Sequence, residues 1–173
     1  KTEGLLAAVV TLIFVAIAFI YTNNMSLMLR VDTFEAMTAD GTAGWRLNLD
    51  DRALVPRYLH FLLGALAVAG AGTALLGWLR RARDAAFATW AMRYGSGWAA
   101  VATFVNLFVG SWWLMALPRE VLRQLAGRDA VATIVLMTGI GFGLVALMAF
   151  AAAARATAPA RPVVVGLSAL PVV

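Results

Sequence analysis

The chain has 173 residues, of which 62% are hydrophobic and only 13% are charged, a balance that excludes a water-soluble domain of this length. It carries a net charge of +5, no cysteine and one histidine. The lack of cysteine excludes disulfide bonds, iron–sulfur ligation and c-type haem attachment by this chain, and the lone histidine excludes a site of several imidazoles. We therefore expect an integral membrane protein of the all-α class.

Four apolar runs each reach the length of about 20 residues that crosses the hydrocarbon core of a bilayer. None of these runs contains Lys, Arg, Asp or Glu. The sequence predicts a single transmembrane domain over residues 1–173, built as a bundle of four transmembrane helices. With their flanking residues, the expected helices cover residues 4–22, 56–80, 95–117 and 130–155. The last apolar run, residues 162–173, is short for a span and predicts a truncated fifth helix.

The distribution of charge predicts the topology. The N-terminus, the loop after the second helix and the C-terminal tail carry seven basic residues against two acidic ones, whereas the opposite side carries seven of each. The positive-inside rule places the "RRAR" loop, residues 80–83, in the cytoplasm. We expect a multi-pass protein of the bacterial inner membrane, whose net charge reflects topology and for which nucleic acid is not a partner.

The first helix, residues 4–22, is expected to run outward. Tyr21 fits the aromatic belt at the membrane interface, and Asn23 with Asn24 marks the exit from hydrocarbon. The helix is too long for a signal peptide and lacks a small-residue cleavage site. The outer loop, residues 23–55, is expected to be ordered, with short helices and turns that include the "DGTAGW" turn.

The second helix is expected to begin at Pro56, a residue that suits the first turn of a helix because its missing N–H would be unpaired there anyway. It then runs inward. Small residues follow at intervals of four, at Ala65, Ala69, Thr73 and Gly77. This stripe predicts close contact with another helix.

The third helix is expected to end with Trp112 and Trp113 in the outer interface. The "PREVLRQLAGRD" stretch after it predicts a short amphipathic helix on the outer surface. In the fourth helix, Gly139 and Gly143 have the spacing of tight helix packing. Asn106, near the middle of the third helix, favours an interhelical hydrogen bond over a cofactor contact.

The only histidine, His60, lies about 6 Å into the second helix, counted from Pro56 at about 1.5 Å per residue. An ionisable group within a membrane helix favours a functional role. The candidate roles are a haem ligand, a proton relay, a hydrogen-bond partner of a quinone and a satisfied interfacial histidine, and composition alone does not choose between function and structure. Gly64, one turn further on the same face, leaves bare backbone where a flat macrocycle needs clearance.

Met137 lies about 10 Å into the fourth helix, near the expected depth of His60. A methionine in a membrane helix usually only packs against its neighbours. Gly139 and Gly141 follow this one, however, so the helix face beside the ligand would be sterically open. Methionine with histidine is a known axial pair of low-spin haem iron and raises its reduction potential. Met137 is therefore a candidate ligand.

Arg57 precedes His60 by one turn at the membrane interface. It would pair with a haem propionate, or extend its guanidinium toward lipid headgroups, and both roles stay open. Met25 and Met28, close to the outer surface after the first helix, are alternatives to Met137 as the sixth ligand of the iron.

No catalytic motif is present in the sequence: there is no metal-ligand cluster, no nucleophile beside a histidine, no P-loop and no carboxylate within a span. The "GIGFG" run, residues 139–143, superficially matches a dinucleotide fingerprint but lies inside an apolar helix with no preceding strand. We expect no catalytic residue, and the chemistry is assigned to a bound cofactor or to another subunit.

Residues 55–103, which contain "VPRYLHFLLGALAVAG" and "RRARDAAF", resemble the helix of subunit I of cytochrome bd quinol oxidases that carries a haem b histidine, with its basic turn and the next helix. "LMTGIGFGLVAL" is similar to the later family helix that bears the methionine ligand, and "TNNMSLML" is weakly similar to an exit motif of the family. The resemblance implies that His60 and Met137 are the axial ligands of the outer, low-spin haem b. The family's histidine helix also runs inward from the periplasmic side.

The chain departs from the family at three points. Only the twelve residues 118–129 stand where the oxidases carry a long quinol-oxidising loop. The arginine that commonly precedes the family's methionine is missing, the residues here being Val135 and Leu136. The family helices of the high-spin haems and the oxygen site would precede the start of this sequence. Quinol oxidation and oxygen reduction are therefore not assigned to this chain.

The resemblance implies a membrane-integral haem b electron-transfer subunit of a respiratory complex, part of an oxidoreductase but without its own substrate-converting site. It would hold one low-spin haem b, with quinol as a further candidate ligand, near the periplasmic face. Electrons would pass between a periplasmic cytochrome or quinol and other membrane subunits within the lipid bilayer. The expected cofactor-binding residues are His60, Met137, Gly64, Arg57, Gly139 and Gly141.

A competing interpretation is a cofactor-free membrane anchor or assembly subunit of a larger complex. Small-residue stripes and tryptophan belts would hold such a subunit in place, and His60 would act only as a hydrogen-bonding residue. A small transporter is less favoured. No span carries a charged residue, and only one glycine-rich stretch would allow a transmembrane helix to be interrupted, as in transporter binding sites.

Overall fold

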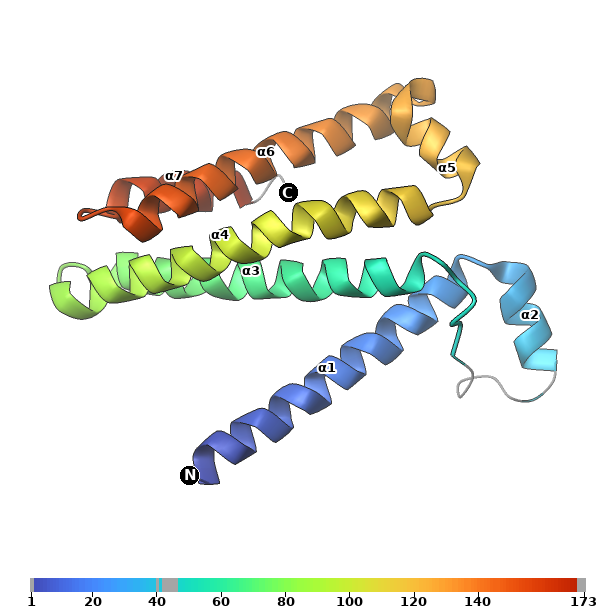
Figure 1. Ribbon diagram of the computed structural model, residues 1–173, viewed down its shortest axis with the longest axis horizontal. Helices are drawn as coiled ribbons and strands as arrows, with labels where there is room; N and C mark the ends of the chain where they lie inside the picture. The colour runs from blue at the N-terminus through green and yellow to red at the C-terminus, as the bar shows by residue number, and fades with distance from the viewer. Residues whose placement is uncertain (1, 40, 42–46, 171–173) are drawn as a thin grey trace. The chain divides into compact units, whose positions relative to one another are not determined.

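A computed structural model describes residues 2–39, 41 and 47–170 (Figure 1). Every regular element in this part of the chain is helical, which confirms the all-α prediction. The elements in chain order are α1 (Thr2–Met28), α2 (Val31–Ala39), α3 (Leu54–Arg80), α4 (Ala85–Ala116), α5 (Arg119–Arg123), the π-helical turn η1 (Gln124–Arg128), α6 (Ala130–Arg155) and α7 (Ala160–Ala169).

Four of these helices, α1, α3, α4 and α6, are long and apolar enough to cross a membrane. They contain 27, 27, 32 and 26 residues, so that each exceeds the hydrocarbon thickness of about 30 Å. The prediction of a multi-pass membrane protein is confirmed. The short apolar run near the end of the sequence forms α7, which is ten residues long.

The third span begins ten residues before its expected start. Helix α4 starts at Ala85, and the carboxylate of Asp84 caps it by accepting a hydrogen bond from the backbone N–H of Phe87 at 3.0 Å. The expected loop after the second helix therefore shrinks to residues 81–84. The boundary was misplaced because apolarity marks the hydrocarbon core, whereas a capped helix continues into the interfacial region.

A short helix is present where the sequence predicts one, as α5 and η1, and none of its residues is buried in the protein. Its place on the outer surface of the membrane stays a prediction. Gly127 ends this helix with a φ of 118°, a left-handed conformation that glycine adopts without strain. The carboxylate of Asp129 then caps α6 by accepting hydrogen bonds from the backbone N–H groups of Val131 and Ala132, at 2.9 Å and 3.1 Å. Gly127 and, two residues later, Asp129 thus separate this short helix from the span.

The chain divides into two compact units, Lys1–Leu62 and Leu63–Val173. The first unit contains α1, α2 and the first turns of α3. The second unit contains the rest of α3 and all the later helices.

Helices α3 and α4 approach each other through glycine in the second unit. A Cβ atom added at Gly95 would lie 2.5 Å from the carbonyl oxygen of Gly70 and 2.6 Å from the backbone nitrogen of Ala74. One added at Gly77 would lie 2.8 Å from the carbonyl oxygen of Ala88. The two backbones are therefore close enough to exclude any side chain at these positions, as small-residue packing in membranes requires.

The predicted small-residue stripe on the second helix is half correct. Thr73 and Gly77 lie on the contact face, but Ala65 and Ala69 are exposed. The observed face uses residues 70, 73, 74 and 77. A strict repeat of four drifts around a helix of about 3.6 residues per turn, whereas spacings of three and four stay on one face.

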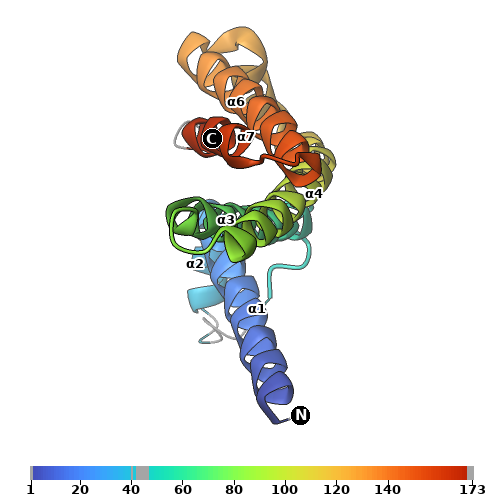
Figure 2. The ribbon, with the colours of Figure 1, turned by 90° about the vertical axis from the view of Figure 1, so that its left-hand side faces the viewer.

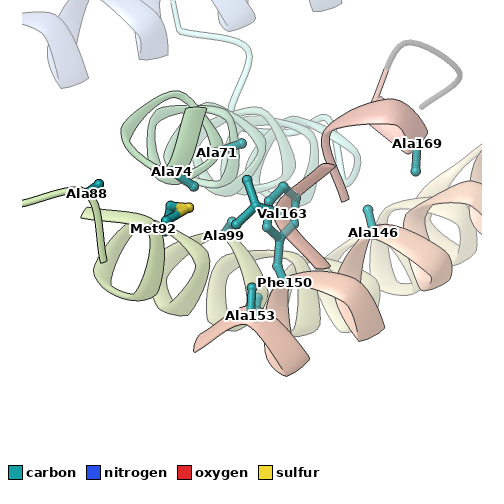
Figure 3. Close-up of a cluster of buried hydrophobic side chains, with 11 residues drawn as sticks. Ala71, Ala74, Ala88, Met92, Ala99, Ala146, Phe150, Ala153, Val163 and Ala169 are labelled. Carbon is teal, nitrogen blue, oxygen red and sulfur yellow. The ribbon is translucent and has the colours of Figure 1, made fainter. Parts of the chain in front are cut away.

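The core of the second unit joins α6 and α7 to α4. Phe150 and Val163 are 1% and 0% exposed, and Figure 3 shows them next to each other. A Cβ atom added at Gly166 would lie 2.9 Å from the Phe150 ring, so the absence of a side chain on α7 makes room for this ring. Figures 1 and 2 show α7 alongside α6.

The predicted tight packing at Gly139 and Gly143 is wrong for the described residues. A Cβ atom added at either glycine would meet no described atom within 4 Å. The buried residues of α6 lie in its second half, from Gly143 to Ala153, where it packs on α4 and α7. Figure 1 shows α4 and α6 diverging toward α5, which explains why the first half of α6 lacks close neighbours.

Candidate functional site

His60 lies six residues after Leu54, about 9 Å along α3, and its side chain is partly buried. Its ring centroid is 6.5 Å from that of Phe61. Within the described residues, no group of three or more His, Cys, Asp and Glu side chains could hold a metal ion. A single imidazole within a membrane helix can act as an axial ligand of haem iron or as a hydrogen-bonding residue.

A buried set of polar side chains, the polar cluster, joins α1 to the start of α3. Its members Asn23, Ser26, Asn48 and Arg57 are at most 7% exposed. The backbone N–H of Asn48 donates to Oδ1 of Asn23 at 2.7 Å, and Nη1 of Arg57 donates to Oγ of Ser26 at 2.5 Å. Because Asn23 and Ser26 lie one turn apart on α1, Asn48 and Arg57 attach to neighbouring positions on one helix face.

Further contacts fix the surroundings of the polar cluster. Arg30 donates from Nη1 to Oδ1 of Asn48 at 2.8 Å and forms a salt bridge with Asp50 at 3.2 Å. The Tyr58 hydroxyl donates to the carbonyl oxygen of Val15 at 3.1 Å. This hydrogen bond joins the start of α3 to the middle of α1. The described residues 47–53 before α3 are therefore held by these contacts. The expected outer loop begins later than residue 23, because α1 continues to Met28. The predicted "DGTAGW" turn lies largely outside the described residues.

One hydrogen-bond donor of Asn48 is unpaired among the described residues. Its Nδ2 is buried and has no partner among the described residues. A buried donor without an acceptor costs about 1 to 3 kcal/mol, which an added carboxylate or carbonyl oxygen would offset. Arg57 lies three residues before His60, so the polar cluster adjoins the turn of α3 that carries the imidazole.

Of the polar cluster, only Arg57 was a predicted site residue. Asn23 carries a signal in the sequence, because it directly follows the expected first span, but this position alone indicates only the exit from hydrocarbon. Ser26 and Asn48 carry no comparable signal, because their burial depends on contacts between residues 18 to 31 positions apart. Sequence spacing cannot reveal such contacts.

Met137 lies on α6 in the second unit and is 54% exposed. Cβ atoms added at Gly139 and Gly141 would meet no described atom within 4 Å, so the helix face beyond the thioether is open. His60 belongs to the first unit. The pairing of these two residues across one haem stays a prediction.

Gly64 lies opposite Asn106 in the second unit, with Nδ2 of Asn106 3.9 Å from the position of an added Cβ. Oδ1 of Asn106 is buried and accepts no hydrogen bond from a described residue. The interhelical hydrogen bond expected of Asn106 is therefore not formed by this oxygen. The amide instead places a polar group beside the glycine that follows His60 by one turn.

Comparison with known proteins adds no relative to this description. No family model matches the chain, and no curated protein or solved structure matches it.

Proposed function

We propose that the chain is a haem b electron-transfer subunit of a membrane-bound respiratory complex, similar to subunit I of cytochrome bd. His60 and Met137 are the proposed axial ligands of one low-spin haem b near the periplasmic face, with the "RRAR" turn in the cytoplasm. The bound haem would supply one-electron transfer. The redox partners would be other membrane subunits and a periplasmic cytochrome or quinol.

The observation that carries the proposal is the position of His60. It is an imidazole, the only one in the chain, on a helix that is long enough to cross the membrane. Polar groups at such positions are costly, which favours a bound partner over a packing role. The resemblance to the histidine helix of the oxidases adds a second, independent reason.

The surroundings of both proposed ligands fit a large planar group. The exposed thioether of Met137 is available to a group outside its own helix, and Gly139 and Gly141 leave the adjoining face clear. Arg57, one turn before His60 on α3, and the unpaired Nδ2 of Asn48 in the preceding loop would hold a propionate carboxylate. In this proposal, His60 and Met137 would bind the haem iron, and Arg57 with Asn48 would bind a propionate.

The test is a reduced-minus-oxidised visible spectrum of the purified protein and of single variants. His60→Ala is expected to remove the b-type signal, because the variant lacks the nitrogen ligand. Met137→Ala is expected to retain the haem, convert it from low spin to high spin and lower its reduction potential, since methionine ligation raises that potential.

Two matched variants control this experiment. Met148→Ala changes another exposed methionine of α6, and Leu62→Ala changes another partly buried residue of α3. Both are expected to keep the wild-type spectrum. A wild-type protein without haem, or a spectrum that neither ligand variant changes, contradicts the proposal.

A cofactor-free anchor or assembly subunit is the second candidate, and α1 favours it. No residue in the most apolar stretch of this helix is buried in the protein. A partner subunit could therefore cover the whole span. Copurification of partner subunits with a haem-free chain, unaffected by His60→Ala, would select this function instead.

A further inference from the structure

Four aromatic side chains form an aromatic ladder along one face of α4: Phe87, Trp90, Tyr94 and Trp98. Successive ring centroids lie 5.9, 5.2 and 6.4 Å apart, and the Trp90 and Tyr94 rings are stacked with an interplanar angle of 11°. Trp90, Tyr94 and Trp98 are 56%, 51% and 45% exposed. The aromatic ladder is thus an outward-facing surface and does not belong to the core of the second unit.

The same end of the second unit is strongly basic. Its charged residues, the basic end, are Arg80, Arg81, Arg83, Arg93, Arg155 and Arg161, with Asp84 as the only acid among the described residues there. Asp84 is engaged in capping α4. The opposite end of this unit is nearly balanced, with Arg119, Arg123 and Arg128 against Glu120 and Asp129. Positive charge is therefore concentrated beside the aromatic ladder.

Two arginines of the basic end, Arg80 and Arg81, contact aromatic rings. The Arg80 guanidinium lies 5.9 Å from the centroid of the Phe87 ring, the outermost ring of the aromatic ladder. Arg81 lies 4.1 Å from the Trp78 ring and donates to the Trp78 carbonyl oxygen at 2.6 Å. Such contacts reduce the side-chain entropy that an arginine loses when it binds an anion.

The aromatic ladder extends from the basic end into the membrane. About 20 residues counted back from Trp113, the expected belt at the other interface, reach Tyr94. Phe87 and Trp90 then lie at headgroup depth, whereas Trp98 lies within hydrocarbon. From Phe87 to Trp98 the rise is about 16 Å, which is close to the thickness of one leaflet.

We propose that the basic end and the aromatic ladder together form a binding site for an anionic phospholipid. The arginines would bind the headgroup phosphate, and the rings would contact the glycerol and the acyl chains. A neutral lipid would use only the rings, and a soluble phosphate only the arginines. This site is independent of the proposed haem.

The test measures lipid binding to the full-length purified protein in a neutral detergent. Dioleoyl phosphatidylglycerol and dioleoyl phosphatidylcholine are added separately, and native mass spectrometry gives the affinity of each. The anionic lipid is expected to bind more tightly. Arg80→Gln with Arg83→Gln is expected to weaken its binding about 25-fold, at about fivefold for each arginine, and to leave phosphatidylcholine unaffected.

Matched variants separate this site from general charge and from folding. Arg119→Gln with Arg123→Gln removes the same charge at the opposite end and is expected to change nothing. Arg83→Gln alone, at an exposed residue, is expected to give about a fivefold loss even where the double variant does not fold. Trp90→Leu is expected to weaken the binding of both lipids. Phe108→Leu, at another exposed aromatic residue, is expected to leave the binding of both unchanged.

Three results would overturn the proposal. The first is equal binding of the two lipids, which would leave only an ordinary aromatic belt. The second is an equal loss of binding when the arginines of the opposite end are removed. The third is tight binding of inorganic phosphate or glycerol phosphate, which would identify a soluble anion as the ligand.

Discussion

The two units of the chain bury different kinds of side chain. The described buried residues of the second unit are mostly alanine and glycine, and the exceptions are Phe150, Met92, Val163, Pro159 and the polar Ser96. The first unit buries Thr22 and the polar cluster beside Leu27, Ala53, Leu54 and Pro56. One unit is held by close approach of helix backbones, and the other is held by hydrogen bonds between distant parts of the chain.

The membrane explains the difference. Lipid tails are as apolar as leucine, so burying a large apolar side chain between helices within hydrocarbon gains little beyond packing. Small residues increase that packing by letting the backbones approach. Near the interface, where the polar cluster lies by sequence, backbone groups outside a helix need side-chain partners instead. Each unit should therefore be most sensitive to a different kind of substitution.

The largest effect is expected from adding a methyl group between helices. Gly95→Ala would place a Cβ 2.5 Å and 2.6 Å from backbone atoms of α3, which cannot move aside without separating the helices. We expect a loss of about 3 kcal/mol of unfolding free energy, at the upper end of common overpacking costs. Thermal unfolding of the purified protein in detergent measures this loss.

Gly97→Ala is the matched control on the same helix. Its Cβ would meet no described atom within 4 Å, and alanine favours helix by up to about 1 kcal/mol over glycine. We expect a stability equal to or above that of the wild type. Similar losses for Gly95→Ala and Gly97→Ala would refute close backbone approach as the basis of stability in the second unit.

A smaller loss is expected when the polar cluster is broken. Asn23→Ala removes the acceptor of the buried Asn48 N–H, whose hydrogen bond is 2.7 Å long. The unpaired donor should cost about 2 kcal/mol. Hydrogen exchange of the Asn48 amide, together with thermal unfolding, would locate the effect in the loop before α3.

The neighbouring Asn24 provides the control, because its side chain is exposed and accepts only a long hydrogen bond from Nδ2 of Asn23, at 3.4 Å. Asn24→Ala is expected to change stability by less than about 0.5 kcal/mol. If both variants lose the same unfolding free energy, the asparagines stabilise the protein only as polar side chains at the membrane interface. The contrast between the two units then does not hold.

Most of the fold could be predicted from the sequence, because the length of an apolar run directly reports a membrane span. The start of α4 and the contact face of α3 could not, since the first depends on a cap at Asp84 and the second on which neighbour a helix meets. Of the candidate site, the lone histidine and Arg57 stand out by residue type. Asn48 enters the polar cluster only through contacts across the chain.

The smallest effect is expected at a helix cap of the second unit. The Asp84 carboxylate accepts a single exposed hydrogen bond, 3.0 Å from the backbone nitrogen of Phe87. Asp84→Ala should cost about 1 kcal/mol, and Asp84→Ser should recover most of it because serine also caps helices. The polar contact at Asp84 is local, whereas that of Asn23 spans 25 residues, so its loss should be the milder of the two. If thermal unfolding shows a larger loss of stability for Asp84→Ala than for Asn23→Ala, the fold depends on helix caps more than on the polar cluster.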